Sequence, residues 1–212
     1  MSSTLFLCGG EEGLALSAQA FVDVLKGGRV ALLLQGPGLQ KYVPRYVRPW
    51  TACGLAGYEV VAPDEQGHFN VSRDLEKLER AAGIFVGGGN TAVYQRLYAA
   101  GPVGDLIRRR CAEGVPYGGL SAGMLIAGQV CPLEPEETGE SKIRLAQGLG
   151  LFSGMLFEPH FSSENRRENL LTYLRLSGIP TGCGVDDETC VILRSGEAMK
   201  VIGKPVIPVT LE

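Results

Sequence analysis

The stretch VPYGGLSAGMLIAG, from Val115 to Gly128, indicates most clearly how this chain folds. An apolar run reaches a glycine pair, Ser121 follows between small residues, and the chain continues as small apolar residues with helical potential. Residues 119–123 fit the pattern G-x-S-x-G, so the stretch predicts a strand, a sharp turn and a helix. Ser121 is then either a nucleophile raised above a sheet or only the cap of the helix that follows.

The segments before this stretch show the same order of strand and helix. Four apolar runs are each followed by a longer segment with helical spacing, and they lie at residues 4–10, 29–36, 58–63 and 83–89. Such alternation predicts a mostly parallel sheet with helices on both faces, which is a three-layer α/β sandwich. Because no repeat or linker interrupts the pattern, we expect residues 1–212 to form a single domain.

The pattern loosens after Gly128. Residues 131–142 are interpreted as an acidic loop, residues 154–161 as a further strand, and residues 162–178 as a helix with a serine cap. The tail at residues 182–210 alternates and turns like antiparallel strands. We expect these strands to close the C-terminal edge of the sheet.

Composition argues against several classes of partner. A net charge of −3 offers no basic surface for nucleic acid, and the cluster Arg108–Arg110 is interpreted as a solvated helix face. No apolar stretch approaches the ~20 residues of a membrane span, and the N-terminus does not resemble a signal peptide, so a cytoplasmic location is expected. The two histidines, His68 and His160, and six cysteines without a C-x-x-C pair predict no metal site and reduced, buried thiols.

A second glycine-rich turn follows the expected strand at residues 83–86. Gly87, Gly89 and Ala92 formally satisfy the dinucleotide-binding pattern G-x-G-x-x-G/A. The acidic residue that should end the next strand is missing, because Asp105 near that distance lies inside a helical pattern. Dinucleotide binding is therefore the weaker interpretation of this turn.

The same turn can instead stabilise a developing oxyanion. Gly88 or Gly89 would supply a bare backbone N–H group, and the N–H of Ala122 would contribute a second one from the start of the helix after Ser121. Asn90 would then reach the substrate. This arrangement makes the glycine turn a natural partner for Ser121.

His160 is the candidate base. It ends an expected strand at the presumed edge of the site, whereas His68 lies in a polar loop. A serine hydroxyl needs a general base to become nucleophilic near neutral pH, and that base needs an orienting acid. Carboxylates follow in GVDDETC, residues 184–190.

The order of these motifs resembles that of the dipeptidase E and cyanophycinase family of serine peptidases. The shared motifs are VGGGNT at 86–91, GGLSAG at 118–123, PHF at 159–161 followed by Arg166, and GCGVDDETC at 182–190. The match spans roughly residues 83–191. The resemblance implies an α/β hydrolase with a serine, a histidine and an acid in that chain order, acting on short peptides without a metal or organic cofactor.

By position, the resemblance implies that Ser121 is the nucleophile, that His160 is the base, and that the acid lies within residues 185–188. Family members that share this tail typically have Ile-Asp-Glu where this chain has Val-Asp-Asp at 185–187, so Asp187 is the expected acid. Glu188 is the reserve, because it would point to the other face if this segment were a strand.

A second departure from the family concerns the charge of the substrate. Cyanophycinase-like members have an arginine four residues after the histidine, where this chain has Glu164, although Arg166 is retained. The substrate-binding residues that we expect are Asn90, Thr91, Glu164 and Arg166. The negative charge of Glu164 argues against the preference for acidic side chains that is typical of the family.

Three functions follow, in this order of preference. The first is a serine peptidase of exopeptidase or dipeptidase type that forms an acyl-enzyme on Ser121. The second is a catalytically idle binding or regulatory protein on the same fold. The third is an amidotransferase-like hydrolase, although that nucleophile is a cysteine and this chain has a serine. Assembly into a homo-oligomer is left open.

Overall fold

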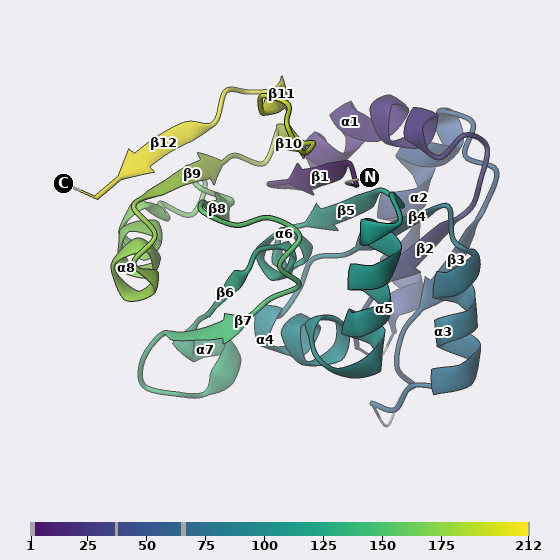
Figure 1. The fold of residues 1–212 in the computed structure, drawn as a ribbon, viewed down its shortest axis with the longest axis horizontal. Helices are drawn as coiled ribbons and strands as arrows, with labels where there is room; N and C mark the ends of the chain where they lie inside the picture. Colours follow the sequence, from purple (N-terminus) through teal and green to yellow (C-terminus); the bar gives the residue numbers. More distant parts are fainter. Residues whose placement is uncertain (1–2, 37, 65–66, 212) are drawn as a thin grey trace.

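The computed structural model describes residues 3–36, 38–64 and 67–211, and its centre is a seven-stranded sheet (Figure 1). Five strands run parallel: β1 (Leu5–Cys8), β2 (Val30–Leu33), β3 (Tyr58–Val61), β4 (Gly83–Val86) and β5 (Tyr117–Leu120). The strand order is β11-β10-β1-β5-β4-β2-β3, and β10 (Thr189–Leu193) and β11 (Lys200–Gly203) are antiparallel at one edge. The predicted α/β fold class, with its antiparallel C-terminal edge, is confirmed.

Helices cover both faces of this sheet (Figure 1). Helices α1 (Glu11–Val24) and α2 (Val43–Ala52), with the short turn η1 (Leu39–Lys41), lie on one face. The other face carries α3 (Val71–Arg80), α4 (Thr91–Tyr94), the π-helical turn η2 (Gln95–Ala99), α5 (Gly101–Ala112) and α6 (Ala122–Ala127). Strand β1 shows why there are two cores: Phe6 packs toward α1, whereas Leu5 and Leu7 pack toward the opposite layer.

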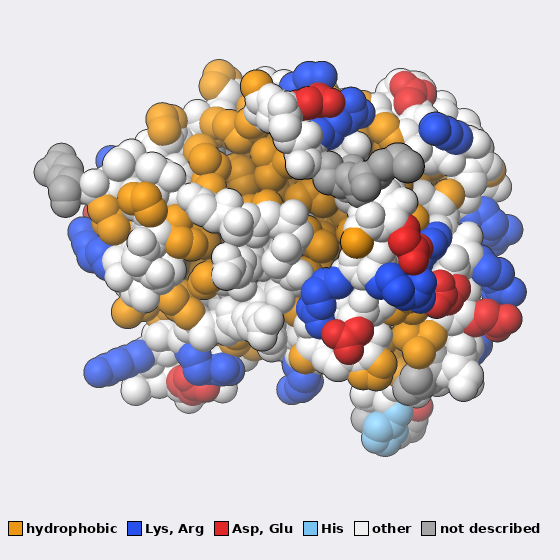
Figure 2. Space-filling view, in the orientation of Figure 1, with side chains coloured by type: hydrophobic (Ala, Val, Ile, Leu, Met, Phe, Trp, Pro, Cys, Tyr) orange, Lys and Arg blue, Asp and Glu red, His pale blue; other side chains and the backbone are white. Residues whose placement is uncertain are grey.

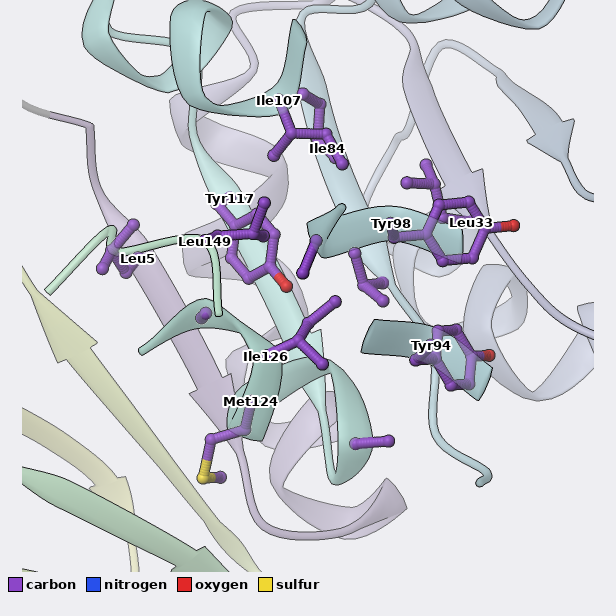
Figure 3. Packing of buried hydrophobic residues seen from close by; sticks show 14 of the residues in the cluster. Leu5, Leu33, Ile84, Tyr94, Tyr98, Ile107, Tyr117, Met124, Ile126 and Leu149 are labelled. Carbon is purple, nitrogen blue, oxygen red and sulfur yellow. The ribbon is translucent and has the colours of Figure 1, made fainter. Parts of the chain in front are cut away.

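Each core is built from fully buried side chains. On the α5 and α6 side, Ile84 and Tyr117 of the sheet belong to one cluster with Ile107 and Ile126 of the helices (Figure 3). Burying one such side chain stabilises the fold by roughly 1.5–3 kcal/mol. These cores hold the carboxyl ends of β1, β4 and β5 in fixed register. The turns that follow those strands therefore lie at the same end of the sheet.

A second, three-stranded sheet carries the later part of the chain. Its order is β12-β9-β8, with β8 (Leu156–Pro159) parallel to β9 (Thr181–Val185) and β12 (Ile207–Thr210) antiparallel to β9. Helix α8 (Arg167–Ser177) packs on it through Leu170, Tyr173 and Leu174. The expectation that the whole tail closes one sheet is therefore wrong for β9 and β12. The chain leaves the small sheet after Val185 and enters the large one at Thr189, so residues 186–188 form the turn between them.

Two local expectations also need correction. The segment expected as an acidic loop contains most of β6 (Val130–Leu133), which pairs with β7 (Arg144–Gln147), and the four-residue helix α7 (Pro135–Thr138). The strand forms because Cys131 and Leu133 are buried in the core. Helix α8 begins at Arg167 without a side-chain cap, since the serines expected to cap it lie in the preceding turn.

Charged side chains gather over α3 and α5 (Figure 2). Arg109 contacts Glu79 and Glu113 across and along these helices. Arg108 and Arg110 are likewise paired with acidic neighbours, as expected for a solvated helix face. Among the residues that the structure describes, no helix is both long and apolar enough to cross a membrane.

Candidate active site

Ser121 occupies the sharp turn between β5 and α6. Its backbone has φ 51° and ψ −109°, a region that residues with a side chain avoid and that costs on the order of 1–3 kcal/mol. The turn is held by the Ser121 N–H, which donates to the Cys8 carbonyl at 3.0 Å, and by the Met124 N–H, which donates to the Ser121 carbonyl at 2.8 Å. The Ser121 hydroxyl makes no capping hydrogen bond, so capping of α6 does not explain this serine.

The glycines of G-x-S-x-G are required by close backbone contacts. A Cβ on Gly119 would lie 2.4 Å from the Gly123 carbonyl oxygen, and a Cβ on Gly123 would lie 2.3 Å from the Val86 carbonyl oxygen. The Tyr117 hydroxyl donates to that same Gly123 oxygen at 2.7 Å. The turn therefore packs directly against the end of β4, which brings the glycine turn after β4 next to Ser121.

His160 faces Ser121 from the small sheet. Its Nε2 lies 3.0 Å from the Ser121 Oγ, and its Nδ1 contacts the Asp187 Oδ1. Because β8 and β9 are parallel, with Pro159 beside Val185, the residues after both strands emerge at the same end. His160 also has a positive φ, 52°, so two residues in strained backbone conformations face each other here.

Asp187, and not Glu188, contacts His160. The expected reason, that neighbouring side chains of a strand point to opposite faces, does not apply. Residues 187 and 188 lie in a turn, where Asp187 meets His160 while Glu188 Oε1 accepts a 2.7 Å hydrogen bond from Lys204 Nζ. Partial burial acts to raise the pKa of Asp187. Hydrogen bonds from Ser163 and His160 outweigh it and hold that pKa below its ordinary value. The carboxylate beside the imidazole is therefore ionised at neutral pH.

The two glycine N–H groups considered as oxyanion donors differ in their surroundings. The Gly88 N–H donates to the Tyr46 hydroxyl at 3.0 Å, so it already has an acceptor. Gly89, with φ 150°, lines the same cavity as Ser121. Within the described part of the chain, neither the Gly89 N–H nor the Ala122 N–H has an acceptor.

Asn90 is occupied by the protein itself. Its Oδ1 accepts from the Val93 N–H at 2.9 Å and caps α4, while its Nδ2 donates to the Glu137 carbonyl at 3.3 Å. The Thr91 N–H donates to Glu137 Oε1 at 2.5 Å, and Thr91 lines the cavity beside Ser121. The Asn90 side chain thus joins α4 to the segment around Glu137 instead of reaching into the cavity.

Arg166 is likewise saturated by protein carboxylates. Its guanidinium donates to both oxygens of Glu134, at 2.7 and 3.1 Å, and its Nε donates to Glu158 Oε1 at 2.6 Å. Asn169 and the Tyr173 hydroxyl also donate to Glu134. Sequence patterns miss this network because its members are distributed over β8, α8 and the start of α7.

The two carboxylates bound to Arg166 differ in protonation. Burial acts to raise the pKa of Glu134, but the hydrogen bonds from Tyr173 and Arg166 outweigh it and lower that pKa. Glu158 is fully buried, and this burial raises its pKa to about 8 despite Arg166. Glu134 is therefore an ionised partner of Arg166, while burial disfavours the charged form of Glu158.

A cavity of about 330 Å³ opens beside Ser121 and His160. Its charged lining residues are Glu134, Glu137, Glu164 and Arg166. The Glu164 side chain is 56% exposed and lies 3.8 Å from Arg166. With Arg166 neutralised by its carboxylate neighbours, the cavity presents more negative than positive charge.

The other candidate sites do not bring together a serine, a histidine and an acid in this way. A larger cavity of about 600 Å³, lined by residues that include Leu5, Arg108 and Leu193, contains none of Ser121, His160 and Asp187. Among described residues, no group of three or more metal-ligating side chains is arranged to hold a metal ion. Asp105, considered for dinucleotide binding, lies in α5 and binds Arg108 at 2.6 Å.

Comparisons with known proteins identify peptidases as relatives of this chain. The model of Peptidase family S51 matches residues 59–202. A cyanophycinase of Geminocystis herdmanii (strain PCC 6308) is 32% identical over 170 residues, which cover 78% of this chain and 62% of that protein. A Peptidase E of Shewanella oneidensis is 30% identical over 140 residues, covering 61% of this chain and 57% of that protein.

The fold has a counterpart among solved structures. A peptidase from an acI-B1 Actinobacterium superposes with a TM-score of 0.75 at 19% identity, covering 99% of this chain and 95% of that one. At that identity the likeness concerns the fold alone. The chain spans only about three fifths of the length of the cyanophycinase and the Peptidase E that it matches.

Proposed function

Because this chain belongs to peptidase family S51, we propose that it is a serine peptidase that hydrolyses short peptides through an acyl-enzyme on Ser121. The observation that supports this most is the chain of contacts from Ser121 Oγ to His160 Nε2, 3.0 Å apart, and from His160 Nδ1 to Asp187. A nucleophile, a base within hydrogen-bond distance and an acid orienting that base are the groups that acyl transfer requires.

In the first half of the reaction, Ser121 Oγ attacks the carbonyl carbon of the scissile peptide bond. His160 Nε2 takes the hydroxyl proton as this bond forms, and Asp187 keeps Nδ1 as the protonated nitrogen. His160 then gives its proton to the leaving amine nitrogen, and the C–N bond breaks. The products of this half are the free amine and an ester on Ser121.

In the second half, a water molecule attacks the ester carbonyl. His160 accepts a proton from that water and returns it to Ser121 Oγ when the ester bond breaks, so the enzyme is regenerated and the carboxylic acid leaves. No metal or organic cofactor enters these steps. Ser121 acts as the serine of a nucleophile elbow, and its strained φ keeps the hydroxyl exposed to the substrate.

The proposed oxyanion donors are the N–H groups of Ala122 and Gly89. Each lacks an acceptor among the described residues, whereas the Gly88 N–H is bound to Tyr46. Ala122 is the first residue of α6, so its N–H belongs to the positive end of a short helix. Gly88 then serves through its small size, since a Cβ there would lie 3.3 Å from Ser121 Cβ.

The substrate is proposed to be a short peptide cleaved near one end, without a preference for acidic side chains. Arg166, the cation that could receive an acidic group, is held by Glu134 and Glu158. Glu137 and Glu164 add negative charge to the cavity lining. An acidic side chain would therefore meet repulsion in this cavity.

The test is a dipeptide and tripeptide library assayed with the wild type and with Ser121→Ala. Each peptide is supplied free, N-acetylated and C-amidated, so that the required terminus identifies the exopeptidase type. We expect hydrolysis by the wild type and a loss of several orders of magnitude in Ser121→Ala, which should keep the wild-type circular dichroism spectrum. A fluorophosphonate probe should label Ser121 in the wild type. If the wild type shows no hydrolysis and no labelling, the idle binding protein is supported instead.

A further inference from the structure

The turn that carries Asp187 is held from one side by two neighbouring serines. The Ser163 hydroxyl donates to Asp187 Oδ2 at 2.7 Å, and the Ser162 backbone N–H donates to Asp186 Oδ1 at 2.9 Å. Since Asp187 Oδ1 contacts His160, Ser163 and His160 bind opposite oxygens of one carboxylate. A carboxylate held at both oxygens has little freedom to rotate.

The same turn is held from the other side by the start of helix α1. The Gly13 N–H donates to the Asp187 carbonyl oxygen at 2.8 Å. Gly10 has φ −150°, which any residue can adopt, yet a Cβ on it would lie 2.7 Å from both Cα and Cβ of Asp187. Glycine at position 10 is therefore required by space alone: it lets the backbone of Asp187 approach this turn.

We propose that Ser163 and Gly10 are positioning residues of the hydrolytic reaction: Ser163 fixes the orientation of the Asp187 carboxylate, and Gly10 lets an aspartate come close enough to orient His160. This inference rests on the proposed function, because it assigns both residues a role in the catalytic step. It gives a reason for Gly10 and for Ser163, which the proposed chemistry itself leaves unused.

The length of the acid supports this assignment. Aspartate is one methylene shorter than glutamate, so its backbone must lie nearer to the imidazole that it orients. The missing side chain of Gly10 supplies that proximity, and Ser163 supplies the second hydrogen bond to the carboxylate. The Ser163 hydrogen bond also favours the ionised form of Asp187, which helps to keep the pKa of Asp187 low.

The first experiment uses the two adjacent serines as a matched pair. In Ser163→Ala the carboxylate loses a donor, so kcat should fall roughly tenfold or more with KM within about twofold, by analogy with other charged hydrogen bonds. Ser162→Ala should retain wild-type kcat, because its contact to Asp186 comes from the backbone N–H. Ser163→Thr keeps a hydroxyl and should recover most of the activity.

A pH profile separates positioning from a loss of folded protein. Without the Ser163 donor, the Asp187 carboxylate accepts more strongly from the imidazole beside it and favours the protonated imidazole, so the acidic limb of kcat/KM should move to higher pH in Ser163→Ala but not in Ser162→Ala. An unchanged limb together with wild-type kcat in Ser163→Ala would overturn the role of Ser163.

The second experiment tests Gly10 by compensation. Gly10→Ala should push the Asp187 turn away and lower kcat at least tenfold, and Asp187→Glu alone should also be impaired. The double variant Gly10→Ala with Asp187→Glu should exceed Gly10→Ala, because the longer side chain spans the added distance. A double variant no better than Gly10→Ala would overturn the role of Gly10, and circular dichroism verifies that each variant is folded.

Different results would contradict the proposed function and the positioning roles of Ser163 and Gly10. If hydrolysis by the wild type does not depend on Ser121, the proposed function is wrong. If it depends on Ser121 but Ser163→Ala and Gly10→Ala both retain wild-type kcat, the function stands and the positioning inference alone is wrong.

Discussion

The carboxylate of Glu188 is bound to the ammonium group of Lys204, with 2.7 Å between Oε1 and Nζ, and the adjacent carboxylate of Asp187 contacts His160 instead. Residues 186–188 form a turn between the two sheets, so three consecutive acidic side chains bind three different partners: Ser162 for Asp186, His160 for Asp187 and Lys204 for Glu188. This turn places only Asp187 of the three against His160.

Replacement of Asp187 or of Glu188 by its amide should therefore have very different effects on kcat. Asp187→Asn should lower kcat by about 10⁴, because the wrong imidazole tautomer is favoured while Ser121 remains in place. Glu188→Gln should cost less than about tenfold, since it disturbs only an exposed ion pair. Steady-state kinetics of both purified variants check this. If Glu188→Gln is the crippling change, the orienting acid must be reassigned.

The two histidines should be separable by the same kind of measurement. His160→Ala removes the proposed base and should lower kcat by several orders of magnitude. His68→Ala should leave kcat almost unchanged, because the His68 side chain is 80% exposed and its described ion pair is with Asp64. In the wild type, kcat/KM should rise between about pH 5 and pH 8, the range in which histidine side chains lose a proton. A flat profile over that range would contradict a histidine base.

The charge at position 164 should control the use of acidic substrates. The wild type should hydrolyse Asp-X dipeptides weakly, and Glu164→Arg should raise kcat/KM for them several-fold, since a cavity carboxylate is replaced by a cation. Glu168→Arg makes the same charge change on the exposed start of α8, outside the cavity lining, and should have little effect. Efficient cleavage of Asp-X dipeptides by the wild type would show that Glu164 does not exclude them.

Glu158 should make the stability of the fold depend on pH. Its pKa is raised by burial to about 8, so between about pH 4.5 and 8 the folded chain holds a proton that the unfolded chain releases. The free energy of unfolding should therefore fall as the pH rises through that window, by about 1.4 kcal/mol for each pKa unit of the shift. Denaturant unfolding of the wild type at several pH values measures this slope.

Two variants isolate the contribution of Glu158. Glu158→Gln keeps an acceptor for Arg166 but cannot titrate, so it should unfold like the wild type near pH 5 and be the more stable protein above pH 8. Glu134→Gln removes the ionised partner of Arg166 and should be destabilised across the whole range. If the wild type and Glu158→Gln show the same pH slope, another group is responsible.

Much of the fold could be predicted because the relevant signals are local. Alternating apolar and helical segments predicted the parallel sheet, since buried strands and covering helices each have their own periodicity. The pairing of the strands in the tail could not be predicted in the same way. Alternation identifies a strand but not the strand that pairs with it, and β9 and β12 pair in a second sheet. Sequence spacing predicts that the serines after His160 cap a helix, but this helix starts only at Arg167.

The sequence by itself determined the sharp turn at Ser121 and the strand that ends just before His160, because glycine spacing and apolar periodicity act over neighbouring residues. Only the tertiary structure decided which carboxylate contacts His160, that the Gly88 N–H donates to Tyr46, and that Arg166 is held by Glu134. These contacts join residues that are 27 to 42 positions apart in the chain. Their partners are set by how two sheets and their helices pack, and no local pattern encodes that packing.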